Sequence, residues 1–564
     1  MEAGEILLNR GLLDEAGLKK TRDAQINGNN LMHTAVQLGL VDEEQALRVI
    51  GEEIGLQFVD LTEFELDLSL LKSFPQRLIH RETLFPLRQQ NDYLLVATCD
   101  PFHLYPLDEI SATTGWSVEP VLASRAEITK LIKTHLGVGS ETVDGLLEQS
   151  DIELVDAIEH DDSELSQMAQ EASVVRLVNE ILLEAIESRA SDVHIESHES
   201  GLTIRYRIDG MLQAQPTPPE INHFHAAIIS RLKIMARLNI AEKRLPQDGR
   251  MKLKVSTREI DVRVSVIPMI HGEGIVMRVL DKGAMAFELQ SLGMPETIYT
   301  QFRELIQLPH GIILVTGPTG SGKTTTLYSS LLEIRDVSTK IITTEDPVEY
   351  QLEGINQIQV QPKIGLTFGS SLRSILRHDP DVVLVGEIRD LETAENAIQA
   401  SLTGHLVFST LHTNDAASAF ARLVDMGAES FLVASTIEAV MAQRLVRTLC
   451  PHCKKDFRPT ATDLPTDFPL DQLNQQGGKL FHSSGCRQCR QLGYLGRTGI
   501  YELLIANDHI RRLAHDRASS WDILNAAVQN DLNTLRHDGW DKVLRGVTSV
   551  DEILRVTKSN NQFT

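Results

Sequence analysis

The chain has 564 residues, enough for roughly three or four domains, because single hydrophobic cores rarely grow beyond about 250–300 residues. Its formal net charge is −24, so we do not expect a nucleic-acid partner, since binding a polyanion needs clustered lysines and arginines. No run of about 18 apolar residues occurs, and the N-terminal MEAGEILLNRG lacks the features of a signal peptide.

Residues 1–140 are predicted to form an N-terminal α/β module that opens with a weak repeat. Gly11-Leu-Leu-Asp-Glu15 and Gly39-Leu-Val-Asp-Glu43 each precede an apolar pattern with the period of a helix. Asp14 and Asp42 are the expected N-caps of those helices. From Leu56 onward, helical and strand-like segments alternate, which predicts a small α/β fold.

Residues 141–169 are predicted to be an acidic, flexible linker. The stretch 138–167 contains no Lys or Arg, and its carboxylates are scattered along its length. Such a composition favours a solvated segment, with one amphipathic turn around Ile152–Ile158 as the alternative.

Residues 170–285 are rich in arginine although the protein as a whole is acidic. A helical apolar stripe begins at Ala172, and a basic helix, HAAIISRLKIMARLNIAE, lies among four strand-like segments: 191–196, 202–208, 251–255 and 260–266. Alternation places Arg205 and Arg207 on one face, and Arg263 on the polar face of its own strand. A solvated sheet face and arginines directed at a nucleotide across a cleft both explain this pattern.

Residues 286–564 are predicted to form the C-terminal domain, and they contain the most informative stretch, GIILVTGPTGSGKTTTLY, at 311–328. The apolar run Ile312–Val315 predicts a buried parallel strand, and a helix is expected from Lys323 onward. Between them lies a match to G-x-x-x-x-G-K-[ST], whose residues are Gly317, Pro318, Thr319, Gly320, Ser321, Gly322, Lys323 and Thr324, followed by Thr325.

This motif predicts a site for a nucleoside triphosphate. The glycines let the backbone wrap a phosphate chain, and the helix directs its positive N-terminal end at the same anion. Lys323 is expected to reach the β and γ phosphates, and the Thr324 hydroxyl to hold Mg²⁺. A glycine-rich turn that matches by chance is the alternative, which the flanking strand and helix disfavour.

Two further strand-like segments end in carboxylates. The segment KIITTEDP ends in Glu345 and Asp346, and DVVLVGEIRD carries Glu387. The carboxyl ends of parallel strands lie at one edge of a sheet, so both should lie beside Lys323, where a carboxylate holds Mg²⁺ or polarises the attacking water. Two ordinary acidic turns are the alternative.

A third segment, GHLVFSTLHTND, contains a predicted strand that is bracketed by His405 and His412. Ser409, Thr410 and Thr413 supply hydroxyl donors that could sense whether a γ-phosphate is present. The alternative is that these histidines are ordinary structural residues with satisfied hydrogen bonds.

Four of the five cysteines form two CxxC pairs, Cys450/Cys453 and Cys486/Cys489. Four thiolates arranged in this way predict a structural, tetrahedral zinc site in an insert spanning 448–492. A disulfide framework or a redox couple is the alternative, which the absence of a signal peptide disfavours.

Together these motifs resemble those of the secretion ATPases of type II secretion and type IV pilus assembly, over about residues 172–557. The stretches that carry the resemblance are ASDVHIE, RYRIDG, LPQDGR, IDVRVSVIP, GEGIVMRVLDK, GPTGSGKTTTLY, TTEDPVEY, DPDVVLVGEIRD, GHLVFSTLHTND, the CxxC pairs and GRTGIYELL.

The resemblance implies a multidomain RecA-like α/β ATPase with a PAS-like α+β arginine-rich domain and a C-terminal zinc knuckle. It also implies a homohexamer that hydrolyses ATP with Mg²⁺ at the cytoplasmic face of the inner membrane, docked to membrane partner proteins through its N-terminal domain. By the same resemblance, individual residues take the family's roles: Glu345 and Asp346 form its Asp box, Glu387 is the Walker B glutamate, His405 and His412 form its His box, and Arg250, Arg263 and Arg278 reach the phosphates.

Within the family, DVRVS, LDK and TTTLYSSL resemble the general secretion pathway E type more than the pilus-extension type, which is the alternative. A non-hydrolysing regulatory ring is less expected, because Lys323, Glu345 and Glu387 are all present. The N-terminal repeat resembles the MshEN module, which binds cyclic di-GMP in some relatives. Here Glu2 replaces an arginine, and Asn30 and Met32 replace an arginine and a glycine, so we expect no dinucleotide binding.

Overall fold

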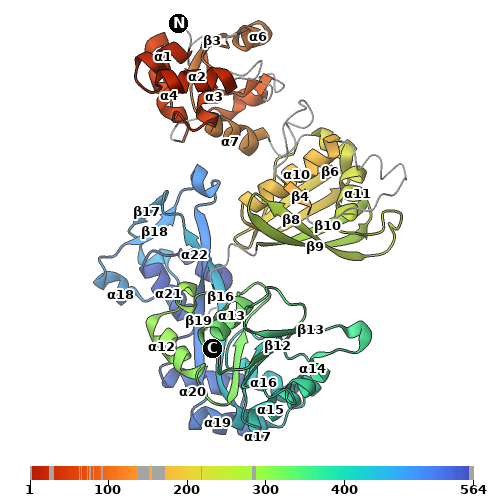
Figure 1. The fold of residues 1–564 in the computed structure, drawn as a ribbon. Coiled ribbons are helices and arrows are strands. Elements are labelled where there is room, and N and C mark those ends of the chain that lie inside the picture. The colour runs from red at the N-terminus through yellow and green to blue at the C-terminus, as the bar shows by residue number, and fades with distance from the viewer. Residues whose placement is uncertain are drawn as a thin grey trace. The chain divides into compact units, whose positions relative to one another are not determined.

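The computed structural model describes residues 3–24, 31–136, 152–154, 172–281 and 287–557, apart from positions 63, 65, 73, 75–77, 80–81, 91–92, 104 and 218. Glu2, Asn30 and most of the predicted linker 141–169 lie outside these residues. The chain divides into two compact units, Met1–Gly283 and Ala284–Thr564, and each is described by itself (Figure 1). The domain limits at 140, 169 and 285 stay predictions.

The first unit opens with the helical repeat. Asp14 and Asp42 are N-caps as predicted, because their carboxylates accept hydrogen bonds from Gly17 N at 2.6 Å and Gln45 N at 3.0 Å. Met32 is 3% exposed in the core of this repeat, so it faces other apolar side chains. The helices are α1 (Ala3–Asn9), α2 (Glu15–Ala24), α3 (Leu31–Gln37) and α4 (Glu43–Ile54).

A small three-stranded sheet follows, in the order β1-β2-β3, with its own apolar core. This agrees with the alternation of helical and strand-like segments after Leu56. Its elements are η1 (Leu68–Lys72), β1 (Leu84–Gln90), β2 (Tyr93–Thr98), α6 (Tyr105–Thr114), β3 (Ser117–Leu122) and α7 (Arg125–Leu136).

The arginine-rich region folds as a seven-stranded antiparallel sheet with strand order β4-β8-β9-β10-β5-β6-β7. Its inward-facing side chains form one core with helices α10 and α11, which follows from the alternating burial along each strand. The elements are β4 (Ile152–Leu154), α10 (Ala172–Glu187), β5 (Ala190–His198), β6 (Gly201–Ile208), β7 (Met211–Ala214), η2 (Pro219–Phe224), α11 (His225–Met235), β8 (Gln247–Val255), β9 (Arg258–Met269) and β10 (Gly272–Asp281).

Strand β4 corrects one expectation. Ile152–Leu154, where the sequence favours at most an amphipathic turn, instead pairs antiparallel with Leu253–Val255 of β8. Ile152 and Leu154 alternate with Glu153 at the period of a strand, but three residues are too short a pattern to recognise without the partner strand.

The second unit contains a seven-stranded sheet of order β13-β12-β14-β15-β11-β16-β19, parallel except for the last pair. β11 is buried throughout because helices cover both of its faces. Ile312 and Leu314 pack in one core with α14–α17, and Ile313 and Val315 pack in another with α12 and α13. The strands are β11 (Gly311–Thr316), β12 (Ile341–Glu345), β13 (Asn356–Gln359), β14 (Val382–Val385), β15 (Leu406–Leu411), β16 (Ile437–Leu449) and β19 (Tyr494–Ile505).

The helices of this unit include α13, which begins at Lys323 as predicted from the motif. The short hairpin β17–β18 lies between the two cysteine pairs in the sequence. The bounds are η3 (Leu289–Leu292), α12 (Glu296–Leu305), α13 (Lys323–Glu333), η4 (Pro362–Ile364), α14 (Phe368–Ile375), α15 (Leu391–Leu402), α16 (Ser418–Asp425), α17 (Ser430–Thr436), β17 (Lys454–Phe457), η5 (Ala461–Asp463), α18 (Leu470–Gln475), β18 (Leu480–Ser483), η6 (Arg487–Cys489), α19 (Asp508–His515), α20 (Ser520–Gln529), α21 (Leu535–Leu544) and α22 (Val550–Val556).

Candidate functional site

The loop between β11 and α13 is shaped by the neighbouring strand β16. A Cβ atom on Gly317 would lie 2.4 Å from the backbone oxygen of Gln443, and one on Gly322 would lie 2.9 Å from the Gln443 side-chain nitrogen. Both glycines also have positive φ, at +147° and +88°. Only glycine fits these two positions, so the loop keeps a bare backbone of the kind that wraps phosphates.

Lys323 is held by the loop that it follows. Its Nζ atom donates to Gly317 O at 2.8 Å and to Pro318 O at 3.1 Å. Burial lowers the pKa of the Lys323 amine, and the negative charge of Glu387 opposes that shift. The Ser321 hydroxyl is buried and has no hydrogen-bond partner, while Thr324 is exposed in the first turn of α13. These unsatisfied and exchangeable donors fit a phosphate chain, and the Thr324 hydroxyl could hold a cation.

Glu387 lies two residues beyond β14, at the edge of the sheet where the loop of Lys323 also lies. Its carboxylate forms an ion pair with Arg389, and its Oε2 atom lies 3.4 Å from Nε2 of His412. The hydrogen-bonded Glu387 raises the pKa of Arg389, with a smaller contribution from Asp346. The fold therefore brings together four side chains that are spread over about 90 residues of sequence: Lys323, Glu387, Arg389 and His412. Arg389 was not identified from the sequence as part of this site.

Glu345 ends β12 and is 5% exposed. Its Oε1 atom accepts hydrogen bonds from the Thr343 hydroxyl at 2.5 Å and from Gln357 Nε2 at 3.0 Å, and its Oε2 atom accepts from the Tyr328 hydroxyl. The sequence predicts Glu345 beside Lys323 at the open edge of the sheet, whereas the structure encloses its carboxylate among three side-chain donors.

His405, the first histidine of the predicted pair, lies away from Glu387. His405 precedes β15, and its Nδ1 atom lies 2.9 Å from Ala400 O and 3.1 Å from the Thr403 hydroxyl. β15 has six residues, which span about 20 Å, so His405 and His412 lie at opposite ends of one strand. The structure brings only His412 to Glu387.

The hydroxyls predicted to sense a γ-phosphate are bonded within the fold. Ser409 donates to Val385 O at 2.8 Å, and Thr410 donates to Gly386 O at 2.7 Å. The Thr413 hydroxyl donates to Asp415 O at 2.9 Å. The backbone N of Thr413 donates at 2.9 Å to the hydroxyl of Thr316, the last residue of β11 before the phosphate-binding loop. These bonds tie β15 and the residues after it to the ends of its two neighbouring strands, β14 and β11.

The three predicted arginines form a row across the sheet of the first unit. Arg250 on β8 lies directly opposite Arg263 on β9, which in turn lies opposite Arg278 on β10. Residues directly opposite one another share a face, and like charges in that position destabilise a sheet. One end of the row is balanced by Asp192, whose Oδ1 atom accepts from Arg278 Nε at 3.0 Å. Arg250 and Arg278 are exposed on this face.

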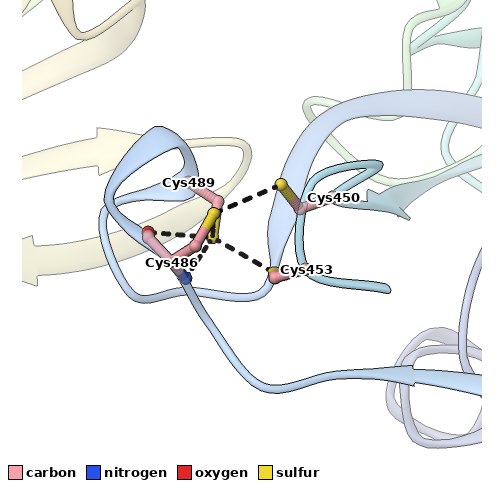
Figure 2. A group of neighbouring side chains, drawn as sticks. All are labelled: Cys450, Cys453, Cys486 and Cys489. Carbon is pink, nitrogen blue, oxygen red and sulfur yellow. Dashed lines mark hydrogen bonds between the residues drawn. The ribbon is translucent and has the colours of Figure 1, made fainter. Parts of the chain in front are cut away.

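The four cysteines gather into one cluster, in which the pair after β16 faces the pair around η6 (Figure 2). The Sγ atoms of Cys450 and Cys486 lie 3.8 Å apart, as do those of Cys453 and Cys489. A tetrahedral zinc ion with Zn–S bonds of about 2.3 Å places its sulfurs about 3.8 Å from one another, so the cluster fits that ion. All five cysteines are free, and a disulfide would need an S–S distance of about 2.05 Å, so the disulfide alternative is not supported.

Comparison with known proteins decides the family. The profile described as "Type II/IV secretion system protein" matches residues 167–555 of the chain. The chain belongs to this family. The MshEN domain profile matches residues 54–142, which lie after the helical repeat that carried the resemblance to MshEN.

Relatives from both branches of this secretion ATPase family match most of the chain. Type II secretion system protein E of Xanthomonas campestris is 44% identical over 561 residues, which are 98% of each chain. Type IV pilus assembly ATPase PilB of Myxococcus xanthus is 39% identical over 557 residues, also 98% of each chain. Type II secretion system ATPase E of Vibrio cholerae is 49% identical over 397 residues, 70% of this chain and 78% of that protein. The chain is therefore a secretion or pilus-assembly ATPase.

A solved structure supports the fold of this secretion ATPase. The X-ray structure of the Legionella pneumophila ATPase DotB matches with a TM-score of 0.50 and 21% identity, covering 67% of this chain and 94% of that one. Among the described helices, none has both the length and the apolar character needed to cross a bilayer.

Proposed function

We propose that this chain is the ATP-hydrolysing motor of a type II secretion system, acting as a homohexamer with Mg²⁺ as its catalytic metal. The observation that supports hydrolysis most directly is the meeting of Lys323, Glu387 and His412 at one edge of a sheet. The full-length likeness to type II secretion system protein E supports the secretion branch.

In this proposal the loop Gly317–Thr325 wraps the phosphates of ATP. Lys323 exchanges the two backbone carbonyls that it now bonds for oxygens of the β and γ phosphates, which costs little because the amine keeps its hydrogen bonds. Thr324 and the carboxylate of Asp346 would hold Mg²⁺. That ion, when bound, neutralises charge on the phosphates.

Glu387 is the proposed residue that positions the attacking water. A carboxylate oxygen orients a water by accepting its proton in a hydrogen bond, so that the lone pair of the water points at the γ-phosphorus. Arg389 contacts one oxygen of Glu387 and His412 lies 3.4 Å from the other, and these two neighbours are proposed to set the orientation of the carboxylate before ATP arrives. Glu345, next to Asp346, is proposed to complete the acidic edge.

The arginine row supports a site shared between subunits. Arg250, Arg263 and Arg278 repel one another where they stand, and an external anion would relieve that repulsion. Phosphates of ATP bound to a neighbouring subunit are the proposed anion, which explains why the ring should be needed for activity. His405 has no proposed contact with ATP, because its hydrogen bonds lie at the other end of β15.

Zinc is the proposed occupant of the cysteine cluster, with a structural role, because four protein ligands leave no position for a substrate. The N-terminal region is proposed to dock to inner-membrane partner proteins at the cytoplasmic face. We also propose that it does not bind cyclic di-GMP. Calorimetry on the full chain should give no heat with the dinucleotide, and saturable binding would contradict this part of the proposal.

The test of the motor is the ATPase rate per subunit against protein concentration, with the mass measured by light scattering on the same samples. A rate that rises as a hexamer forms supports a site completed by a neighbour. A constant rate from monomers would contradict the shared site.

Glu387→Gln should retain ATP binding and slow turnover by about 100-fold or more. Glu395→Gln, which changes an exposed carboxylate on α15, should leave the rate unchanged. Normal turnover in Glu387→Gln would exclude it as the key carboxylate.

A pilus-extension motor is the second candidate, because the PilB relative also matches 98% of the chain. Complementation separates the two. The gene should restore secretion to a strain that lacks its type II ATPase and should not restore pili to a strain that lacks its extension ATPase. The reverse result would assign the chain to pilus assembly.

A further inference from the structure

Three side-chain donors hold the carboxylate of Glu345. A carboxylate can accept about four hydrogen bonds, and here Thr343, Gln357 and Tyr328 supply three of them. Thr343 lies on the same strand and would be near in any parallel sheet. Tyr328 and Gln357 come from other elements, so their arrival at this carboxylate is a feature of the tertiary structure.

These two donors connect the phosphate-binding helix to the edge of the sheet. Tyr328 lies on α13, five residues after Lys323, and Gln357 lies on the edge strand β13. Gln357 also donates to Tyr350 O at 3.0 Å, and its Oε1 atom accepts from Leu352 N at 2.8 Å. Glu345 is thus the point where α13, β12 and the segment leading into β13 are joined.

The hydroxyl of Tyr328 is fixed by its surroundings. The residue is 1% exposed, and its ring lies 5.7 Å from that of Phe287 and 6.4 Å from that of Tyr350, between centroids. Burial, followed by the charge of Glu345, raises the pKa of Tyr328, so the hydroxyl keeps its proton at any physiological pH and can only donate to the carboxylate.

We propose that Tyr328 and Gln357 are positioning residues for ATP hydrolysis, which act by fixing the orientation of the Glu345 carboxylate beside the phosphate-binding helix. This rests on the proposed function, because it assigns Glu345 a part in turnover. Neither residue belongs to the loop that precedes Lys323. Tyr328 holds Oε2 of Glu345, and Gln357 shares Oε1 with Thr343. Removal of the Tyr328 hydroxyl therefore leaves Oε2 without its donor, and removal of Gln357 leaves Oε1 with Thr343 alone, while the loop around Lys323 stays in place.

The first test is Tyr328→Phe, which removes one hydroxyl and keeps the ring in its aromatic cluster. We expect kcat to fall about tenfold with the KM for ATP changed less than about twofold, because binding by the loop is untouched. Tyr206→Phe is the matched control: its ring is fully buried and its hydroxyl donates to a backbone oxygen, Ile181 O at 2.9 Å, in the other unit. It should leave both constants unchanged.

The decisive test repeats the change in a Glu345→Gln background. If Tyr328 acts through Glu345, its effect on kcat should shrink from about tenfold to less than about twofold, since the group that it positions is already altered. An equal loss in both backgrounds, or a wild-type kcat in Tyr328→Phe, would overturn the proposal. Should Tyr328→Phe not fold, Gln357→Met removes the other donor, and comparing its kcat in the same two backgrounds distinguishes the same two outcomes.

This outcome can be told apart from failure of the proposed function. If Glu387→Gln turns over ATP normally, the assignment of the hydrolytic site is wrong. If Glu387→Gln stalls while Tyr328→Phe is as active as the wild type, only the positioning role is wrong.

Discussion

The nucleotide site and the cysteine cluster lie on the same strand, β16, yet they satisfy their polar groups in different ways. Gln443 of β16 lies against the phosphate-binding loop, and Cys450 directly follows the end of that strand. At the nucleotide site, Lys323 bonds to two backbone carbonyls and Glu387 to an exposed arginine, partners that a ligand can replace. At the cluster, four sulfurs face one another.

The difference follows from what each site must do. A site that binds and releases a nucleotide in every cycle keeps partners whose loss costs little, since each broken hydrogen bond is replaced by another. A site that holds one ion permanently is closed by protein ligands, and its binding energy becomes folding energy. Changes at the first site should therefore alter turnover, and changes at the second should alter stability.

The largest expected effect is that of Lys323→Ala. The positive charge and its hydrogen bonds to phosphate are lost together, so ATPase activity should fall by about 1,000-fold or more, while the zinc content stays at one per chain. Release of radiolabelled phosphate measures the ATPase activity, and metal analysis measures the zinc content. Lys340→Ala is the control, because Lys340 precedes β12, at the opposite end of that strand from Glu345. Loss of zinc in Lys323→Ala would show that the two sites are not independent.

Cys453→Ser should show the opposite behaviour. Zinc content should fall to near zero and the unfolding free energy by several kcal/mol, about 3 or more, because a buried ligand position is lost. ATP affinity should change less than about threefold. Cys99→Ser, which changes the one cysteine outside the cluster, should retain zinc. An unchanged zinc content and thermal transition in Cys453→Ser would refute the metal assignment.

Thr316→Val tests whether the loop after β15 needs its hydrogen bond to β11. Valine has the same shape but leaves Thr413 N buried without an acceptor, which costs about 1–3 kcal/mol. We expect a lower thermal transition and a roughly tenfold lower kcat, since Thr413 immediately follows His412. Thr436→Val, whose hydroxyl bonds only within its own helix, should have much smaller effects on both. Equal effects of the two variants would show that this link has no particular role.

The smallest effect is a dependence of stability on pH at Glu552. Hydrogen bonds from Arg555 and Arg447 outweigh burial and lower the pKa of Glu552 to about 2 from 4.5. A carboxylate whose pKa is lower in the folded state adds stability above pH 4.5, and that stability is lost as the pH falls toward 2.

Urea unfolding of Glu552→Gln at several pH values measures this contribution. The variant should be less stable than the wild type by about 2 kcal/mol at pH 7, and the difference should shrink below pH 4.5. Glu392→Gln removes an exposed ion pair with Arg373 and should cost less than about 0.5 kcal/mol at every pH. A difference for Glu552→Gln that does not vary with pH would contradict the ion-pair explanation.

Much of the second unit, Ala284–Thr564, could be predicted from local sequence, because the motifs that indicate its strands, helices and sites each span only a few residues. The buried strand β11, the start of α13 at Lys323, the strands that end near Glu345 and Glu387, and the two cysteine pairs each follow from spacing within a few residues. The caps at Asp14 and Asp42 are local in the same sense. The functional roles of these residues stay predictions until the variants are measured.

What only the tertiary structure decided is which distant side chains meet. Strand register, set by the packing of whole sheet faces, aligned Arg250, Arg263 and Arg278 in one row. The lengths of β15 and its neighbours separated His405 from His412. No local pattern indicated that Tyr328 and Gln357 meet at Glu345, because a hydrogen bond between residues of different elements leaves no pattern in one sequence. The sequence by itself determined the chemistry that this ATPase has available, since each motif is local. The orientation of the side chains that carry this chemistry depends on contacts between elements, which only the folded sheet creates.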